Sequence, residues 1–494
     1  MSESLDLTHS DLAIQDKAFI NNEFVSSASG KTFENLSPID GRKLADVAEC
    51  DSEDVDCAVK AARVAFKDGR WSRAHPKKRK SILLKFADLI LDHAKELAML
   101  DTLDMGKPIA YTERIDARAT ANTVQWYAEA IDKVYDEVAP TGDKSLGLVT
   151  REPLGVIGAV VPWNFPAVMA SWKFAPALAA GNSVILKPAE QSPLSALKLA
   201  ELAAQAGLPE GVFNVLPGFG ETAGQALGRH MDVDMVAFTG STEVGKYFLV
   251  YAGESNMKHI SLECGGKSPN IILSDVPDLD AAARAAGMAI FFNSGQVCTA
   301  SSRLLVQKDI HDEFLEKVKA VGDYMKPGNP LDPNTKMGTM VDQTQLSRVM
   351  DYIDIGQKEG AELAFGGKQV NKETGGAYVQ PTIFDGVKNN MRIAQEEIFG
   401  PVLTTLTFED EDEAVQIAND TIYGLQASLW TSDINKAHNM ARRLKAGTVN
   451  INTTDGGDMT VPFGGYKQSG VGRDKSLHGL HKYTQLKTTF IQLS

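Results

Sequence analysis

The sequence has few cysteines for its length: Cys50, Cys57, Cys264 and Cys298 are the only four in 494 residues. No two of them form a CxxC pair with zinc-ligand spacing, and four thiols in so long a chain give no disulfide framework. We therefore expect free thiols in a reducing compartment and no metal site.

An excess of positive charge is also absent, because 50 Lys and Arg face 64 Asp and Glu, a formal net charge of −14. Nucleic acids and anionic membranes require a basic surface, so neither is expected as a partner. The N-terminal stretch, MSESLDLTHSDLAIQDKAFINNEF, has acids where an export signal has lysines, and no apolar run follows that could serve as such a signal, so we expect the cytoplasm.

No apolar run long enough for a membrane span is left uninterrupted. Residues 153–172 carry no charge, but Pro162, Asn164 and Pro166 divide them. Proline inside a helix removes a backbone hydrogen bond and clashes with the preceding turn. This stretch is therefore interpreted as a buried strand over 156–161, a turn and a helix.

Short apolar strands alternating with amphipathic helices are what the sequence does contain. Strands are predicted over 183–187, 212–216, 235–238 and 259–263, and helices over 194–205, 221–227 and 243–250. This alternation indicates βαβ units and a doubly wound, Rossmann-like α/β fold. A second α/β section is expected from about 265 to 467, with strands in NIILSD, SRLLVQ, GPVLTTLTF and GTVNIN, and the first 130 residues are expected to be mostly amphipathic helix around the sheet.

The chain ends in KTTFIQLS, a β-prone segment that would leave an exposed strand edge without a partner. These residues alone do not decide whether the segment pairs with a strand of the same chain or with a strand of another subunit.

Two glycine-rich stretches favour phosphate binding. Gly218–Ala223 fits GxGxxA after a predicted strand, and Gly240–Lys246 fits GxxxxGK. Tyr247 stands where a P-loop needs a magnesium-binding hydroxyl, so the second stretch suits a dinucleotide phosphate or merely a tight turn.

Four side chains have both a functional and an ordinary interpretation. Cys298, among small residues in FFNSGQVCTASSR, is either a reactive thiol or a small buried hydrophobe. Glu263, before two glycines, is either a general base or a helix cap, and Asn164 is either an amide donor or a partner of the backbone. Glu190, in KPAE at a strand end, is either a ribose acceptor or a solvated surface charge.

Seven motifs occur together in one order: PWNFP, KPAE, FTGST, LECGGKSPN, FFNSGQVC, EEIFGPV and PFGGYKQSGVGRD. Their order and spacing resemble the NAD(P)-dependent aldehyde dehydrogenase superfamily along nearly the whole chain. WYAEAIDKVYDEV and the region from DGGDM to QLKT most resemble bacterial dehydrogenases of γ-glutamyl-γ-aminobutyraldehyde, 4-guanidinobutyraldehyde and related ω-aminoaldehydes of polyamine and arginine breakdown. The motif LECGGK departs from the usual pattern by placing Cys264 where leucine is usual.

The resemblance implies a role for each matching residue. Cys298 becomes the nucleophile, Glu263 the general base and Asn164 the oxyanion donor, with Lys173 also catalytic. The implied cofactor contacts are Pro162, Trp163, Lys187, Glu190, Gly220, Phe238, Gly240, Ser241, Gly265, Glu397 and Phe399. The implied substrate contacts are Phe165, Met169, Trp172 and Phe463 along an aldehyde tunnel, with Asp116, Asp455 and Asp458 near its mouth, where Gly456 and Gly457 leave room.

The resemblance also implies three parts: an NAD-binding domain (1–135 and 155–264), a catalytic domain (265–478) and a small β oligomerisation flap (136–154 and 479–494). It favours pairing of the last strand between subunits, in a homodimer or homotetramer. We expect NAD as cofactor, with NADP weaker because Glu190 should repel a 2′-phosphate. A broad-specificity aliphatic or betaine-type aldehyde dehydrogenase, an enzyme that transfers the acyl group to coenzyme A, and a catalytically silent protein of the same fold are competing interpretations.

Overall fold

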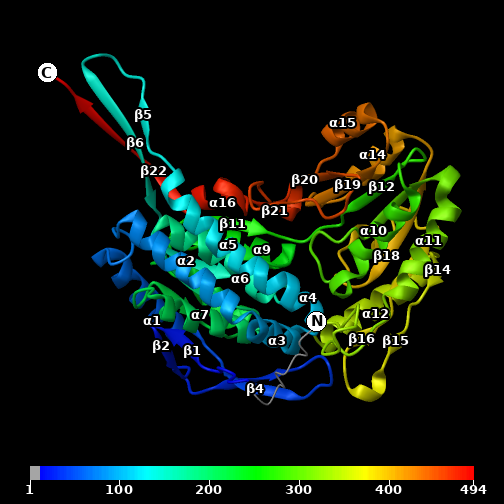
Figure 1. Ribbon diagram of the computed structural model, residues 1–494, viewed down its shortest axis with the longest axis horizontal. Coiled ribbons are helices and arrows are strands. Elements are labelled where there is room, and N and C mark those ends of the chain that lie inside the picture. Colours follow the sequence, from blue (N-terminus) through cyan, green and yellow to red (C-terminus); the bar gives the residue numbers. More distant parts are fainter. Residues whose placement is uncertain (1–11) are drawn as a thin grey trace.

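The computed structural model describes residues 12–494. Residues 1–11, part of the stretch that argued against an export signal, lie outside the described residues. Two lobes stand side by side, and a narrow β-structure projects from the first lobe with the C-terminus at its tip (Figure 1).

The first lobe is built on an eight-stranded sheet in the order β2-β1-β9-β8-β7-β10-β11-β21. Its five central strands run parallel and are almost wholly buried, as a sheet covered on both faces requires. They are β7 (Val156–Val160), β8 (Ser183–Lys187), β9 (Phe213–Val215), β10 (Met235–Thr239) and β11 (His259–Glu263); the short β21 (Gly470–Val471) pairs antiparallel with β11. The predicted doubly wound α/β sheet and its strands are confirmed.

Helices of this lobe pack around the sheet. They are α1 (Ser52–Asp68), α2 (Pro76–Asp92), α3 (Ala94–Met105), α4 (Ile109–Tyr111), α5 (Ala117–Ala130), α6 (Pro166–Ala180), α7 (Leu194–Ala206), α9 (Thr242–Gly253) and α16 (Ser476–His481). The helix predicted over 221–227 is a π-helical turn (Gly220–Gly224) that continues into α8 (Gln225–Arg229). Phe86, Phe174 and Phe213 stack between these helices and the sheet in the largest apolar core.

The expectation that the first 130 residues are mostly helical is wrong for residues 18–48. They form β1 (Ala18–Ile20), β2 (Glu23–Val25), β3 (Thr32–Leu36) and β4 (Lys43–Ala48). Strand β1 pairs antiparallel with β9 and extends the edge of the parallel sheet. Strands this short, half-exposed and at a sheet edge carry too few alternating positions to give a clear period.

The second lobe holds a seven-stranded sheet in the order β14-β17-β18-β13-β12-β19-β20, parallel except at β14. Its strands are β12 (Pro269–Ile272), β13 (Arg303–Gln307), β14 (Glu362–Phe365), β17 (Thr382–Asp385), β18 (Val402–Phe408), β19 (Gln426–Trp430) and β20 (Thr448–Ile451). The helices are α10 (Leu279–Phe291), α11 (His311–Tyr324), α12 (Gln343–Lys358), α13 (Arg392–Gln395), α14 (Glu411–Asn419) and α15 (Ile434–Arg443). The four strands predicted here are confirmed.

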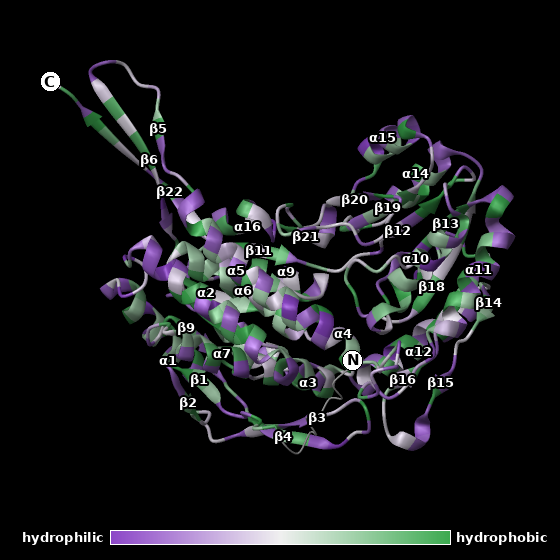
Figure 2. Ribbon diagram, viewed as in Figure 1, coloured by the Kyte–Doolittle hydropathy of each residue, from purple (hydrophilic) through white to green (hydrophobic). Residues whose placement is uncertain are grey.

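The projecting structure is a three-stranded sheet of β5 (Glu137–Ala139), β6 (Ser145–Pro153) and β22 (Thr484–Gln492). Strand β22 pairs antiparallel with β6 along its whole length, from Thr484 opposite Pro153 to Gln492 opposite Ser145. One edge of the last strand therefore has its partner within the chain, while its other edge is unpaired among residues 12–494, so pairing with another subunit stays a prediction. Leu486 and Phe490 stay more than half exposed on this sheet, where Figure 2 shows hydrophobic segments.

All four cysteines are free, as predicted. Among residues 12–494, no helix combines the length and apolar character needed to cross a membrane. The same residues bring together no group of three or more His, Cys, Asp or Glu side chains able to hold a metal ion.

Candidate active site

The register of the parallel sheet brings the candidate residues of the first lobe to one edge. Val160 at the end of β7 lies beside Lys187 of β8 and Phe238 of β10, and Thr239 lies beside Glu263 of β11. Since carboxyl ends of parallel strands form the ligand-binding edge of such sheets, residues 161–165 and 240–241 emerge at the same edge.

Asn164 is tied to the loop that carries Cys298. Its Nδ2 donates a hydrogen bond of 2.9 Å to the carbonyl oxygen of Gln296, and its own carbonyl oxygen accepts one of 2.9 Å from Asn293 Nδ2. Asn293 and Ser294 hold left-handed backbone angles, φ 50° and 54°, which non-glycine residues adopt only where the surroundings impose them. Asn293 and Gln296 belong to the FFNSGQVC motif, but the sequence alone gave them no role.

The Cys298 thiol is half-buried, and the carboxylates of Glu397 and Glu263 lie near enough for their charges to act on it. Burial first, then the charges of Glu397 and Glu263, raise its pKa to about 12, while the backbone amides of Thr299 and Cys298 act in the opposite direction. A Cβ on Gly266 would lie 2.7 Å from the Cys298 carbonyl oxygen, so this glycine allows the loop to approach the end of β11. The free thiol is therefore protonated at neutral pH.

The Glu263 carboxylate is buried, with 2% of the residue exposed, and neither oxygen has a hydrogen-bond partner among the described residues. Burial and the nearby Asp474 raise its pKa well above the ordinary value, against the opposing charges of Lys173 and Lys482. A buried orphan carboxylate is costly and needs an explanation. It is suited to accept a proton from a water molecule.

Lys173 is fully buried and lies near enough to Glu263 for its charge to act on that carboxylate. Its ammonium pairs with Asp474, whose other carboxylate oxygen accepts from Lys482. Burial lowers the pKa of Lys173, and Asp474 opposes this effect. Lys173 therefore acts on Glu263 through its charge and makes its contacts with Asp474.

The residues predicted to hold a dinucleotide surround an open helix N-terminus. Ser241 caps the twelve-residue α9, and its Oγ accepts a hydrogen bond of 3.2 Å from Val244 N. The space beside Gly220 is open, because a Cβ added to this glycine would meet no atom within 4 Å. Lys187 Nζ donates to the Pro188 carbonyl at 2.6 Å and lies 3.8 Å from Glu190 Oε2. Free backbone amides, open space and a buried ammonium fit a pyrophosphate, and Glu190 fits a ribose. Beside them, the Phe238 ring fills the space over Gly240.

The second lobe contributes Glu397 and Phe399 to the same region. The Glu397 carboxylate packs against Gly265 so closely that a Cβ added to this glycine would lie 1.9 Å from Oε2. Its Oε1 accepts a hydrogen bond of 3.0 Å from Gly266 N. Burial raises the pKa of Glu397 to about 7. The Phe399 ring lies edge-on to Trp163 with centroids 5.2 Å apart, and Pro162 stands half-buried before Trp163.

Aromatic side chains lie along one face of the start of α6. Phe165, Met169 and Trp172 are spaced by four and three residues, which places them on one helical face. The Trp172 ring meets the Phe463 ring edge-on, with centroids 5.2 Å apart. The ring centroids of Phe165 and Phe292 are 6.4 Å apart. Of the predicted tunnel residues, Trp172 and Phe463 therefore contact each other, whereas Phe165 contacts Phe292, to which the sequence alone gave no role.

The predicted acids of the tunnel mouth do not share one environment. Asp455 and Asp458 are exposed, but Asp116 is only 1% exposed, and its two carboxylate oxygens accept from Lys107 Nζ at 2.8 and 2.6 Å. Lys107 Nζ in turn lies 3.9 Å from the Phe165 ring centroid. The placement of Asp116 at the mouth is therefore wrong: it lies behind the aromatic wall, with its charge already paired.

Cys264 points into apolar packing rather than toward Glu263. It is 4% exposed in a core cluster with Phe238, Phe248 and Leu262, and its Sγ would be 2.9 Å from a Cβ on Gly245. Burial raises the pKa of this thiol to about 12. This packing agrees with a small apolar residue beneath the strand end.

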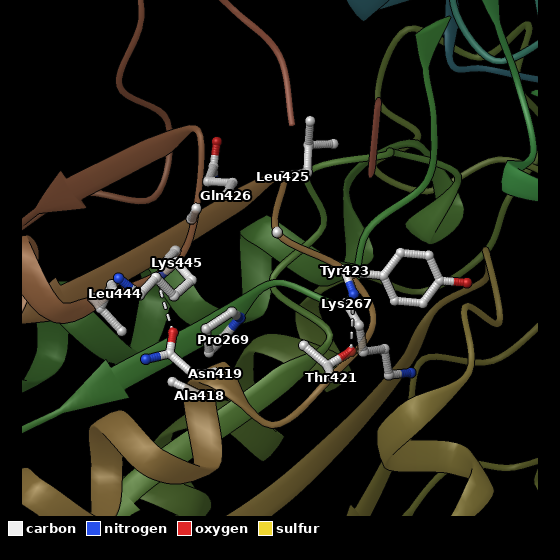
Figure 3. Close-up of a pocket in the computed structure, with 13 residues that line it drawn as sticks. Lys267, Pro269, Ala418, Asn419, Thr421, Tyr423, Leu425, Gln426, Leu444 and Lys445 are labelled. Atoms are coloured by element: carbon white, nitrogen blue, oxygen red, sulfur yellow. Dashed lines mark hydrogen bonds between the residues drawn. The ribbon is translucent and has the colours of Figure 1, made fainter. Parts of the chain in front are cut away.

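A small cavity of about 10 Å³ lies apart from these groups, in the second lobe. Lys267, Thr421, Tyr423 and Leu444 are among its lining residues (Figure 3). Its volume suits at most one water molecule, and neither Cys298 nor Glu263 lines it.

Comparisons with known proteins agree with this arrangement. Residues 24–489 match the aldehyde dehydrogenase family. The chain is 53% identical to the NADP/NAD-dependent aldehyde dehydrogenase PuuC of Escherichia coli (strain K12), over 98% of this chain and 97% of that protein. Two solved structures each cover 98% of both chains. The P. syringae indole-3-acetaldehyde dehydrogenase AldA with NAD+ and IAA has 58% identity and a TM-score of 0.98, and the γ-glutamyl-γ-aminobutyraldehyde dehydrogenase of Burkholderia cenocepacia J2315 has 57% and 0.97.

The match covers almost the whole chain at high identity, and the motifs that carried the resemblance lie in its active-site region. The resemblance noted from the sequence, and the fold it implied, are confirmed. The chain belongs to the aldehyde dehydrogenase family.

Proposed function

We propose that this protein oxidises an ω-aminoaldehyde to the carboxylic acid with NAD, through a thioester on Cys298. The observation that carries the proposal is that an amide, a thiol and a carboxylate lie close together at one edge of the first sheet. The Asn164 amide is bonded to the Cys298 loop, and the unpartnered Glu263 carboxylate lies near enough to raise the pKa of the Cys298 thiol.

The Cys298 thiol first gives its proton to the nearby Glu263 carboxylate, which passes it to water, and the resulting thiolate then attacks the aldehyde carbon. The new C–S bond leaves negative charge on the former carbonyl oxygen, and that charge requires donors already in place. The second N–H of the Asn164 amide and the backbone N–H of Cys298 serve as these donors. Hydrogen bonds from Asn164 to Gln296 and from Asn293 to Asn164 fix the amide before substrate arrives.

Lys187, Glu190, Gly220, Phe238, Gly240 and Ser241 would hold NAD from the first lobe, with Pro162, Trp163, Gly265, Glu397 and Phe399 around the rest of it. Bound NAD would supply the acceptor for the hydride that the aldehyde carbon loses. NADP is the weaker cofactor, because Glu190 repels a 2′-phosphate.

Hydrolysis of the thioester depends on Glu263. Its carboxylate removes a proton from water as the water oxygen attacks the acyl carbon, and the C–S bond then breaks to release the acid. A carboxylate with a raised pKa is a stronger base than an ordinary one. The charge of Lys173, which is bound to Asp474, opposes the rise in the pKa of Glu263 and so favours the ionised carboxylate.

The substrate class is inferred from the tunnel mouth and from a relative. The exposed Asp455 and Asp458 stand where an ammonium or guanidinium tail would be attracted, and the Burkholderia relative is a γ-glutamyl-γ-aminobutyraldehyde dehydrogenase. A panel of aldehydes with cationic, neutral and acidic tails, followed by NADH absorbance with both nicotinamides, tests the proposal. Highest kcat/KM for aminoaldehydes supports it, whereas equal values for hexanal would favour a broad-specificity aliphatic enzyme.

The same assay distinguishes hydrolysis from acyl transfer and from a lack of turnover. A silent protein of this fold would form no NADH with any aldehyde. An acyl transferase would form an acyl-coenzyme A product, and that reaction has no need of a water-activating base such as Glu263. Free acid as the product supports hydrolysis.

We also propose the three-part division, with residues up to 135 and 155–264 for NAD, 265–478 for catalysis, and 136–154 with 479–494 as an oligomerisation flap. The outer edge of β22 is unpaired in the described chain, and Leu486 and Phe490 are 60% and 62% exposed. A homodimer or homotetramer would cover them. Light scattering of the full chain and of Phe490→Glu tests this, since loss of assembly is expected only in the variant.

A further inference from the structure

Lys475 places an ammonium group on the aromatic wall of the tunnel mouth. Its Nζ lies 4.6 Å from the Trp172 ring centroid and 5.7 Å from that of Phe463. The backbone of Lys475 is left-handed, with φ 58°, a conformation that few non-glycine residues adopt. An ammonium over such rings is held by their negative faces, and some of its N–H bonds stay free for another acceptor.

The acids around Lys475 do not provide a direct counter-ion. The Asp474 carboxylate is already bound to Lys173 and Lys482. Burial lowers the pKa of Lys475, against the opposing charges of Asp455, Asp458 and Asp474. Within residues 12–494, neither Asp455 nor Asp458 forms an ion pair with the Lys475 ammonium. Lys475 has therefore lost much of its water without gaining a paired carboxylate, which is unfavourable unless a ligand supplies one.

We propose that Lys475 is a specificity-determining residue that binds a carboxylate on the tail of the aldehyde, while Asp455 and Asp458 attract an ammonium on the same tail. The inference rests on the proposed function, because it assigns a partner within the same tunnel. The substrate class is then an aldehyde whose tail ends in an α-amino acid, with charges of both signs.

The charges at the mouth distinguish this class from a purely cationic tail. A guanidinium or lone ammonium would approach two exposed carboxylates but would also meet the Lys475 ammonium, which repels it. A zwitterionic tail satisfies both signs, and a charge-assisted hydrogen bond to Lys475 adds to the attraction. The γ-glutamyl group has this composition; 4-guanidinobutyraldehyde does not.

The test compares acid and ester on the wild-type enzyme. γ-Glutamyl-γ-aminobutyraldehyde is assayed against its methyl ester, which keeps the ammonium and loses the carboxylate charge, with NADH formation as readout. The acid should exceed the ester in kcat/KM by roughly 10-fold or more, as expected for a hydrogen bond between charged groups. Lys475→Met should abolish this ratio, Lys475→Arg should preserve most of it, and Lys60→Met, at an exposed lysine of α1, should leave it unchanged.

Each outcome separates this inference from the proposed function. An acid-to-ester ratio near one in the wild type, with 4-guanidinobutyraldehyde still preferred over hexanal, overturns the role of Lys475 and leaves the aminoaldehyde proposal standing. Preference for hexanal over every charged aldehyde overturns the aminoaldehyde proposal. If Lys475→Met raises kcat/KM for cationic aldehydes but leaves the acid-to-ester ratio unchanged, Lys475 only neutralises Asp455 and Asp458, and the inference is wrong. The wild-type comparison decides even if the variants fail to fold.

Discussion

The side-chain amide of Asn164 is bonded to the carbonyl oxygen of Gln296, two residues before Cys298, at 2.9 Å. The loop that carries the nucleophile and the turn that carries the oxyanion donor therefore form one rigid unit across 132 residues of chain separation. An amide fixed before substrate binds does not have to reorganise when charge develops, which is the condition for a large electrostatic contribution.

Replacing Asn164 should therefore affect chemistry more than binding. Asn164→Ala is expected to lower kcat by roughly 100- to 1000-fold, the usual effect of removing one oxyanion donor. The dissociation constant for NAD, measured by fluorescence quenching, should change little. If KM for the aldehyde rose and kcat stayed near the wild-type value, Asn164 would be a binding residue instead.

The pH dependence of turnover should report Glu263. This carboxylate works as a base only when ionised, and its raised pKa means that it becomes protonated at a higher pH than an ordinary glutamic acid. When hydrolysis limits turnover, kcat should consequently fall as the pH decreases through that raised pKa, and stay high above it. A steady-state profile from about pH 5 to 9 checks this. An acid limb at the ordinary glutamate value would contradict the role of Glu263.

Cofactor preference should depend on Glu190. Glu190→Gln removes the negative charge beside the proposed ribose site but keeps the shape of the side chain. We expect kcat/KM for NADP to rise by about 10-fold relative to that for NAD, since a repulsive charge is lost. Glu201→Gln, on α7, removes a glutamate charge elsewhere and serves as the control. An equal change in kcat/KM for both cofactors would show that Glu190 does not discriminate between a 2′-hydroxyl and a 2′-phosphate.

Asp455 should select for charge on the tail of the aldehyde. Asp455→Ala is expected to raise KM for 4-guanidinobutyraldehyde several-fold and to leave KM for hexanal unchanged, because the side chain is exposed and acts through its charge. Kinetics with both aldehydes at low and high salt provide the measurement. Equal effects on the two aldehydes would remove the electrostatic account.

Local sequence pattern was sufficient for the parallel sheets. Buried strands such as β8 and β10 are runs of three or four apolar residues between helices, and these runs are visible without knowing any contact. The order of the motifs was likewise enough to place Asn164, Glu263 and Cys298 in one region. Strands β1 to β4 were missed because their pattern depends on the sheet edge that they join.

Pairing between charged side chains could not be predicted. Asp116 was interpreted as a free acid, but Lys107, nine residues earlier, takes both of its oxygens in a buried pair. Asp474 and Lys173 meet across 301 residues of chain separation, and Lys475, the residue after Asp474, lies over the Trp172 ring. The number of charges at a site is readable from sequence, but which of them remain unpaired depends on the fold.

The most direct test of the account is the capture of its covalent intermediate. Glu263→Gln, mixed with NAD and aldehyde and quenched in acid, should accumulate a thioester because water is no longer activated. Peptide mass spectrometry should find the acyl group on Cys298 after one burst of NADH, and Cys298→Ala should give neither burst nor adduct. Full NADH turnover by Cys298→Ala, or an acyl group on another cysteine, would contradict the mechanism.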